Sequence, residues 1–179
     1  NELNIFLKYV KEASFIGEVG LDISSKGTNN IELQKKIFES IVNECAKVGN
    51  KIISIHSRKT DDIIFDFLKR SSCIYIMHWY TGNIKRLLNA MSSDDNIYVS
   101  INSDMVHSYN SRKLIEAVPL SRMVLETDAP FTAKTKNEYP KQILNDIVIE
   151  IAKIKKIERL QVLKTISDNS RKILSIQER

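Results

Sequence analysis

Five short runs of apolar residues, each followed by a helical pattern, constrain this fold more than any other feature of the sequence. The runs are near-continuously hydrophobic rather than alternating, as at 52–55 and 97–101, so both faces of each strand are expected to be buried. Between them, apolar residues recur at helical spacing, as at Ile37, Ile41 and Cys45. Strands and helices that alternate in this way form βαβ units around a parallel sheet. The predicted fold class is therefore α/β.

The same patterns predict where the elements lie. Strands are predicted at residues 15–19, 51–56, 74–78, 97–101 and 123–125. Helices are predicted at residues 3–12, 57–68, 84–91, 114–118, 143–152 and 160–176. The helix that carries Ile37, Ile41 and Cys45 is predicted to follow a cap at the end of the loop 24–30 and to stop at Gly49-Asn50. The segment 102–111 is predicted to be a loop. Its His107 is left out of the predicted site, because no strand directly precedes it.

Composition excludes some functional classes and leaves others open. The 179 residues suit a single domain, and 42% hydrophobic with 27% charged residues suits a soluble globular protein. No apolar run approaches the roughly 20 residues of a membrane helix, so no membrane association is predicted. Two cysteines, Cys45 and Cys73, are too few for a disulfide scaffold and favour a reduced, cytoplasmic location. The net charge of +5 permits a nucleic-acid partner without requiring one.

Four of the predicted strands end in a residue that can bind a metal ion. These residues are Glu18, His56, His78 and Asp128. In parallel barrels and doubly wound sheets, the chemistry lies at the carboxyl ends of the strands. The sequence therefore predicts one ring of metal ligands, and this ligand set suits Zn²⁺, Mn²⁺ or Mg²⁺ without choosing among them.

These residues, and Arg58 two positions after His56, also have simpler interpretations. Glu18 could cap the next helix, Asp128 could form a turn, and Arg58 could pair with Asp61 or Asp62 at the surface. A single strand-end histidine is more often a hydrogen-bonding residue than a ligand. The occurrence of such residues at four strand ends together favours the metal site. There, Asp128 could accept a proton from metal-bound water, and Arg58 could hold a phosphate.

Two aromatic residues directly follow His78. Trp79 and Tyr80 could stack on a nucleic-acid base or form the wall of the pocket, and both are candidate substrate-binding residues.

Several motifs resemble those of the TatD family of metal-dependent deoxyribonucleases, which are amidohydrolase-like TIM barrels. The match begins near Phe15 and runs to the end of the chain, with Gln34 also fitting. The motifs that carry it are Ile-Gly-Glu-Val-Gly-Leu-Asp at 16–22, Ile-His-Ser-Arg at 55–58, His-Trp-Tyr-Thr-Gly at 78–82, Leu-Glu-Thr-Asp-Ala-Pro at 125–130 and the closing segment 168–174.

The resemblance implies a TIM (β/α)8-type barrel that hydrolyses DNA phosphodiester bonds, with single-stranded DNA or 3′ ends as the expected substrate. It implies two divalent metal ions in a complete barrel. Glu18 would be a carboxylate shared between metals, and His56 and His78 would be ligands. Asp128 would be both a ligand and the proton acceptor, and Arg58 would lie near the scissile phosphate.

The chain departs from the family pattern at its beginning. The family opens with a strand carrying His-x-His and two further strands, whereas here fourteen residues without histidine precede Phe15. We therefore expect about five of the eight βα units, in a single domain 1–179 that is truncated at its N-terminus. A missing N-terminal segment or a partner chain would complete the barrel. Two alternatives are a catalytically impaired scaffold subunit, for example of a phage-defence complex, and an amidohydrolase acting on a small molecule.

Overall fold

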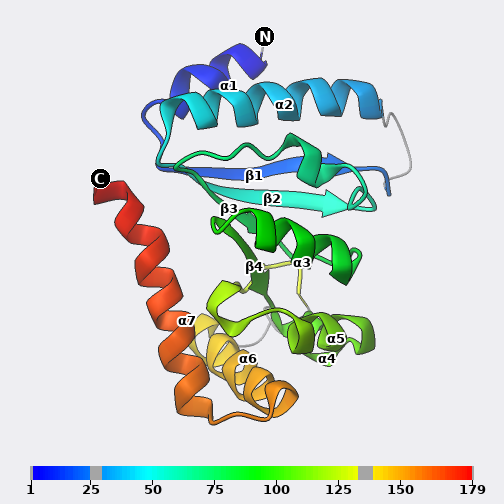
Figure 1. Ribbon diagram of the computed structural model, residues 1–179, viewed down its shortest axis with the longest axis vertical. Helices are drawn as coiled ribbons and strands as arrows, with labels where there is room; N and C mark the ends of the chain where they lie inside the picture. The colour runs from blue at the N-terminus through cyan, green and yellow to red at the C-terminus, as the bar shows by residue number, and fades with distance from the viewer. Residues whose placement is uncertain (1, 25–29, 133–138, 179) are drawn as a thin grey trace. The chain divides into compact units, whose positions relative to one another are not determined.

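The computed structural model describes residues 2–24, 30–132 and 139–178, and it contains one parallel sheet (Figure 1). Parallel pairing is seen for β1 with β2, for β2 with β3 and for β4 with β5. The strand order follows the sequence and has β1 and β5 at its ends, so the sheet is not closed. The strands are β1 (Phe15–Asp22), β2 (Ile52–Arg58), β3 (Ile74–Met77), β4 (Ile97–Ile101) and β5 (Met123–Leu125). The α/β prediction is confirmed.

Most of the predicted helices are present. They are α1 (Glu2–Val10), α2 (Ile31–Val48), α3 (Ile84–Ser93), α4 (Ser103–His107), α5 (Tyr109–Ala117), α6 (Pro140–Lys155) and α7 (Arg159–Leu174), with short 3₁₀ turns η1 (Ile64–Phe67), η2 (Leu120–Arg122) and η4 (Ser175–Glu178).

Two predicted segments differ from the structure. The helix predicted at 57–68 is wrong for most of its length, because β2 continues to Arg58 and only the turn η1 follows. The buried Thr60 hydroxyl donates to the carbonyl of Leu21, which holds this segment against β1. The loop predicted at 102–111 is also wrong, because α4 and α5 occupy it. The Asn102 side chain accepts from the first backbone N–H groups of α4, and this capping favours a helix.

The chain forms two compact units, residues 1–98 with 173–179, and residues 99–172. In the first unit, α2 packs on β1, and α1 packs on α2. In the second unit, α4 and α5 both pack against α6. Asn169 in α7 donates from its amide nitrogen to the carbonyl oxygens of Leu120 (2.9 Å) and Met123 (2.8 Å), so the start of β5 is tied to that helix. Within the described ranges, no helix combines the length and apolar character that a membrane span requires.

Candidate metal centre

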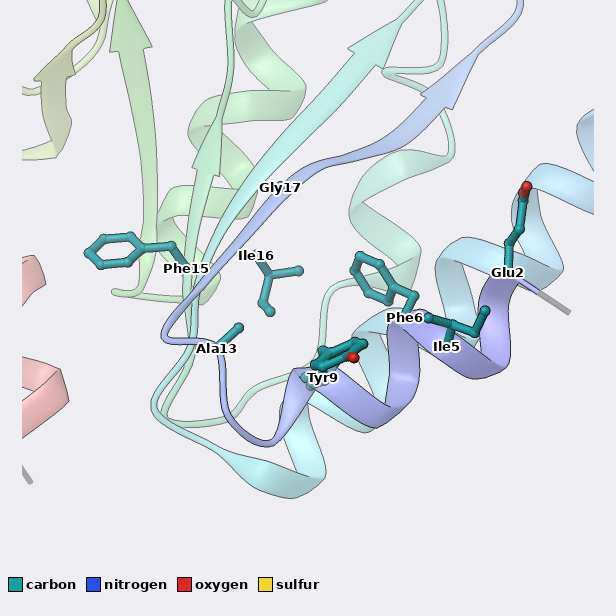
Figure 2. Close-up of a pocket in the computed structure, with 9 residues that line it drawn as sticks. Glu2, Ile5, Phe6, Tyr9, Ala13, Phe15, Ile16 and Gly17 are labelled. Atoms are coloured by element: carbon teal, nitrogen blue, oxygen red, sulfur yellow. The ribbon is translucent and has the colours of Figure 1, made fainter.

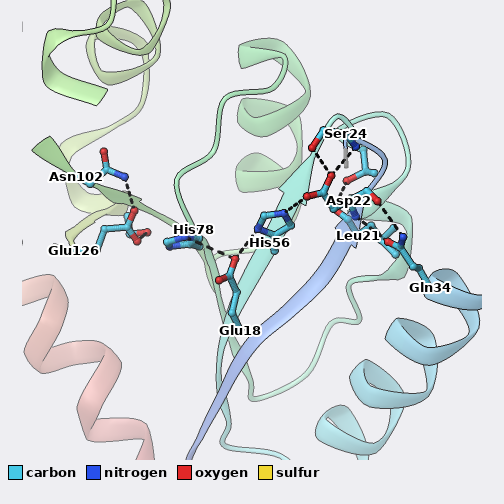
Figure 3. A network of polar contacts seen from close by, with 11 residues as sticks. Glu18, Leu21, Asp22, Ser24, Gln34, His56, His78, Asn102 and Glu126 are labelled. Atoms are coloured by element: carbon cyan, nitrogen blue, oxygen red, sulfur yellow. Dashed lines mark hydrogen bonds and ion pairs between the residues drawn. The ribbon is translucent and has the colours of Figure 1, made fainter. Parts of the chain in front are cut away.

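Three of the predicted ligands meet in the first unit. The Glu18 carboxylate in β1 lies 2.6 Å from His56 Nδ1 at the end of β2, and the same oxygen lies 3.7 Å from His78 Nε2 after β3 (Figure 3). The Glu18 and His56 side chains are 44% and 35% exposed, whereas that of His78 is 14% exposed. The cluster is therefore open to solvent on the Glu18 side and half-buried at the imidazoles.

Glycine makes this approach of β1 to β2 possible. Gly20 pairs with His56 in the parallel register, and its φ of +155° is unusual for residues with a side chain. A Cβ atom at Gly20 would overlap the His56 carbonyl oxygen. At Gly17 a Cβ atom would lie 2.8 Å from Ser54 Cβ. The two glycines that flank Glu18 therefore let the strand lie close to the strand that carries His56.

A second carboxylate contacts the other side of the His56 ring. Asp22 Oδ2 lies 3.0 Å from His56 Nε2, and Asp22 Oδ1 accepts from the Ser24 hydroxyl and backbone N–H, both at 2.6 Å. Partial burial acts to raise the pKa of Asp22. Hydrogen bonds from Ser24, together with His56, outweigh burial and lower this pKa to about 2. Asp22 is thus a carboxylate at neutral pH.

Sequence reasoning gave Asp22 no role, although a signal was present. Glu18 and Asp22 are four residues apart in one strand, and residues at even spacing point to the same face of a strand. Once Glu18 is a site candidate, Asp22 is a candidate by strand periodicity alone.

The chemistry of the His56 ring favours a cation at this cluster. A neutral imidazole donates through one nitrogen only, and an ionised carboxylate only accepts. His56 lies between two carboxylates, so both contacts are hydrogen bonds only when the ring carries two protons. A divalent cation shared by Nδ1 and Glu18 would satisfy the lone pairs of both. The mixture of carboxylate oxygen and imidazole nitrogen also suits Zn²⁺ or Mn²⁺.

The spacing within the cluster is that of hydrogen bonds. No group of three or more His, Cys, Asp or Glu side chains within the described part of the chain is arranged to hold a metal ion. Two atoms bound to one Zn²⁺ at roughly 2.1 Å lie about 3 Å or more apart. The 2.6 Å contact between Glu18 and His56 is shorter than this. The residue types fit a metal, and the side chains contact one another directly.

A pocket of about 220 Å³ adjoins the two histidines. Besides His56 and His78, it is lined by Arg58, Trp79 and two small hydroxyl residues, Ser57 and Thr81. Arg58 is exposed at the end of β2, and Trp79 is half-buried with a φ of +37°. Two of the three predicted substrate-binding residues, Arg58 and Trp79, thus lie beside the metal-ligand candidates.

Tyr80 is not on this pocket. Its side chain is fully buried, its ring lies 5.9 Å from that of Phe65, and its hydroxyl donates to the carbonyl of Asn83 at 3.0 Å. Burial also raises the pKa of its phenol. A base cannot stack on a ring that protein atoms cover, so the structure gives Tyr80 a packing role.

Asp128 lies in the second unit, immediately after β5. It is half-buried with a φ of +50°, and its carbonyl accepts from the backbone N–H groups of Phe131 (2.7 Å) and Thr132 (3.3 Å). Asp128 therefore occupies a tight turn at a strand end, as the sequence predicted. That it joins Glu18, His56 and His78 stays a prediction.

The same strand end carries a carboxylate that sequence reasoning did not single out. Glu126 accepts hydrogen bonds from the Ser100 hydroxyl and from the Asn102 amide nitrogen, the latter at 3.1 Å. Both donors are buried and lie at the end of β4. The signal was its position, since Glu126 directly follows the strand predicted at 123–125 and precedes Asp128 by two residues. His107, which the sequence left out of the site, is exposed at the end of α4.

Comparison with known proteins assigns the chain. The model of the TatD related DNase family matches residues 1–175. The chain belongs to the TatD family. This confirms the resemblance drawn from the sequence motifs.

Individual TatD relatives agree with this assignment. An uncharacterized metal-dependent hydrolase of Methanocaldococcus jannaschii is 33% identical over 158 residues, which cover 87% of this chain and 60% of that protein. The human 3′-5′ RNA nuclease TATDN2 is 25% identical over 183 residues, covering 95% of this chain and 24% of that protein. The chain thus spans less than two thirds of the length of these relatives.

A solved structure supports the fold. The crystal structure of YJJV, a TatD homolog from Escherichia coli, superposes with a TM-score of 0.79 at 16% sequence identity, covering 95% of this chain and 70% of that one. The TatD-type fold of this chain is therefore shown by structure as well as by sequence.

Proposed function

We propose that this chain forms the metal-binding part of a TatD-type hydrolase that cleaves phosphodiester bonds in nucleic acid. The observation that carries the proposal is the meeting of Glu18, His56 and His78 from the neighbouring strands β1, β2 and β3. The names of relatives support the class. Besides the human RNA nuclease, the deoxyribonuclease Tat-D of Schizosaccharomyces pombe is 27% identical over 119 residues.

In this proposal, Glu18, His56 and His78 hold a divalent ion, with Mg²⁺, Mn²⁺ and Zn²⁺ as candidates and two ions in a complete barrel. Such an ion lowers the pKa of a bound water and polarises a phosphoryl oxygen. Asp128 completes the ligand set and accepts the proton of the attacking water. Its half-buried position at a strand end suits this role, because a proton acceptor must be within reach of solvent and substrate.

The pocket beside the histidines would receive the substrate. The exposed Arg58 guanidinium can bind a phosphate through two parallel hydrogen bonds. Trp79 offers a half-buried aromatic face on which a base can stack. We therefore propose single-stranded DNA, attacked from its 3′ end, as the substrate.

We also infer that a further β/α segment, from the same or a second polypeptide, covers the outer edge of β1. Within the described residues, β1 has a neighbouring strand on one side only. A groove of about 400 Å³ lies between α1 and the start of β1 (Figure 2). Its lining includes Ile5, Tyr9 and Phe15, which are 60%, 54% and 62% exposed. Exposed apolar side chains beside an unpaired strand edge favour a covering segment.

Binding of a hydrophobic dye to the chain tests this inference. Dye fluorescence should be high for this chain and should fall in the double variant Tyr9→Ser with Phe15→Ser. It should also fall when the part of a relative that lies outside the region matched by this chain is added as a separate polypeptide. Unchanged fluorescence on that addition would contradict the covering segment.

The activity itself is tested with 5′-labelled single-stranded DNA and a titration of Mg²⁺, Mn²⁺ or Zn²⁺. We expect metal-dependent shortening from the 3′ end. Asp128→Asn should lower the rate by about 10²- to 10⁴-fold, the usual contribution of a general base. Asp168→Asn is the matched control. It makes the same charge change at a carboxylate that is 53% exposed and pairs with Arg171, and it should leave the rate unchanged.

Other outcomes distinguish the alternatives. DNA binding without cleavage at any metal concentration would contradict the activity and indicate a scaffold subunit. Turnover of small esters or lactones without DNA cleavage would indicate a small-molecule amidohydrolase.

A further inference from the structure

We propose that Asp22 is a positioning residue that fixes the His56 ring with its proton on Nε2 and its lone pair on Nδ1, facing Glu18. This inference rests on the proposed metal-dependent function, and it adds a residue to which neither the family match nor the relatives assign a role. Its basis is a chain of contacts that runs from α2 through Asp22 to the imidazole (Figure 3).

The Asp22 carboxylate has one oxygen for each neighbour. Oδ1 accepts two hydrogen bonds of 2.6 Å from Ser24, one from its hydroxyl and one from its backbone N–H. Oδ2 lies 3.0 Å from His56 Nε2. Because Ser24 holds Oδ1, the carboxylate cannot rotate without losing two short hydrogen bonds. Asp22 therefore presents Oδ2 to the ring in a fixed orientation.

The backbone of Asp22 is held as firmly as its side chain. The Gln34 side chain in α2 accepts from the Asp22 N–H at 2.9 Å and donates to the Asp22 carbonyl at 3.0 Å. Asp22 also pairs with Arg58 in the register of β1 with β2. The end of β1 is thus bound to a helix and to a strand, so the position of Oδ2 does not depend on a mobile side chain.

The consequence for His56 is a choice between two tautomers. With the proton on Nε2, the ring donates to Asp22, and Nδ1 keeps the lone pair that a metal requires. With the proton on Nδ1, the Nε2 lone pair would face the Asp22 carboxylate, and two acceptors would repel each other. The Nδ1 lone pair meets the same repulsion from Glu18, 2.6 Å away, unless a cation is bound there, so the preference set by Asp22 is measured without the Glu18 carboxylate. A carboxylate behind a metal-binding histidine commonly sets the tautomer and the orientation of the ring. The geometry at Asp22 matches that arrangement.

Substitution by asparagine should invert the tautomer rather than merely loosen the ring. In Asp22→Asn, the two Ser24 donors keep the side-chain oxygen, so the NH₂ group faces His56. That group only donates, so Nε2 must accept and the proton moves to Nδ1. Asp22→Ala removes the contact and should give a mixture of tautomers. Asp62→Asn is the charge-matched control at an exposed carboxylate in the same unit.

The primary readout is nitrogen-15 NMR of the His56 ring in the metal-free Glu18→Ala chain at about pH 8, where an ordinary imidazole is neutral and Glu18 no longer competes with Asp22 for the ring proton. In this background we expect the Nε2–H form with Asp22 or with Asp62→Asn present, and the Nδ1–H form with Asp22→Asn present. Calorimetric titration with Zn²⁺ is the second readout. Affinity should fall by about 10- to 100-fold in Asp22→Asn, as is typical for loss of such a partner, and should stay constant in Asp62→Asn.

The outcomes separate this inference from the proposed function. If the wild type binds Zn²⁺ and Asp22→Asn keeps both its tautomer and its affinity, the positioning role is wrong and the proposed function stands. If the wild type binds no Zn²⁺, the proposed function fails, whereas the tautomer still reports on Asp22. Should Asp22→Asn not fold, Asp22→Ala replaces it. Loss of the Oδ2 contact should then populate both tautomers, and an unchanged single tautomer would overturn the inference.

Discussion

Two carboxylates, Glu18 within β1 and Glu126 directly after β5, have opposite surroundings. In the first unit, Glu18 contacts the imidazoles of His56 and His78. In the second unit, Glu126 accepts hydrogen bonds from the neutral donors Ser100 and Asn102. An imidazole can exchange its proton for a metal ion, whereas a hydroxyl or amide donor cannot readily do so. The two carboxylates thus look alike in the sequence, and their neighbours give them different chemistry.

The difference originates in the neighbouring strands. Beside Glu18, Gly20 allows β1 to lie against the backbone of β2 at His56. Beside Glu126, the end of β4 supplies side chains with hydrogen-bond donors, and both are buried. A carboxylate that is surrounded by fixed neutral donors is already satisfied. We infer that Glu18 can exchange its hydrogen-bond partners for a metal ion, whereas Glu126 keeps its hydrogen bonds.

Of the substitutions that test this comparison, Gly20→Ala should have the largest effect on stability. A Cβ atom there overlaps the His56 carbonyl oxygen, and the backbone of β2 cannot move aside without losing its register. We expect a loss of about 3 kcal/mol in the free energy of unfolding, with a loss of Zn²⁺ affinity. Denaturant unfolding followed by the fluorescence of Trp79, the single tryptophan, measures the first unit.

Gly17→Ala serves as the comparison for that experiment. Its Cβ atom would lie 2.8 Å from the Cβ atom of Ser54 and would not overlap a backbone oxygen. The loss of stability should therefore be smaller than for Gly20→Ala. Equal losses in the two variants would mean that the approach at His56 has no special importance.

Asn102→Ala should give the next largest effect, in the second unit. Asn102 is fully buried, and it both caps α4 and donates to Glu126. Loss of the cap and of the hydrogen bond should cost about 2 kcal/mol in the free energy of unfolding. Amide hydrogen exchange in α4 and β5 measures this local loss.

Asn102→Asp separates the two contributions. Its carboxylate can still cap α4, but it places a negative charge against Glu126. If the contact with Glu126 matters, this variant should be at least as unstable as Asn102→Ala. Wild-type protection from exchange in Asn102→Asp would show that only the cap contributes.

The sequence predicted most of the strands well because each depends on local pattern. The strand predicted at 15–19 is the exception, because β1 continues to Asp22 and Glu18 lies within it. Residues 97–101 and 123–125 were predicted at the bounds that the structure gives for β4 and β5. Glu18, His56 and His78 came together because they come from β1, β2 and β3, which are neighbouring parallel strands. These predictions needed only hydrophobic runs and the residue that ends each run.

The predictions that failed depended on contacts between distant residues. Thr60 is held by the carbonyl of Leu21, 39 residues away, and this contact favours an extended end of β2 over a helix. Tyr80 was assigned to substrate because it follows His78, but packing against Phe65 buries it. Asp22 was missed although strand periodicity places it on the same face as Glu18, because its contact with His56 is seen only in the structure. Local sequence contains no record of the contacts made by Thr60 and Tyr80.

The smallest expected effect is on the acid dependence of unfolding, which should differ between the two units. In the first unit, Asp61 accepts from the Asn83 N–H (3.0 Å) and from Arg86 (2.8 Å). Burial acts to raise the pKa of Asp61, but these two partners outweigh it, so the pKa lies below its usual 3.8. A carboxyl with a lowered pKa in the folded state stabilises the fold above about pH 4, and this contribution is lost as the pH falls further. Asp61→Asn should therefore reduce the acid dependence of unfolding.

Glu150 in the second unit is the matched carboxylate. Its pKa is also lowered, first by the hydrogen bond from Lys153, against the effect of burial, and then by the charges of Lys153, His107 and Arg112. Asp61 and Glu150 are 20% and 21% exposed, and the charged partners of both are exposed side chains, which contribute little to stability. Asp61 differs because it also accepts a hydrogen bond from a backbone N–H, that of Asn83. Glu150→Gln should thus change the acid dependence less than Asp61→Asn. The free energies of unfolding of both variants, measured between about pH 5 and pH 2, give this difference. A larger change in Glu150→Gln than in Asp61→Asn would contradict the prediction.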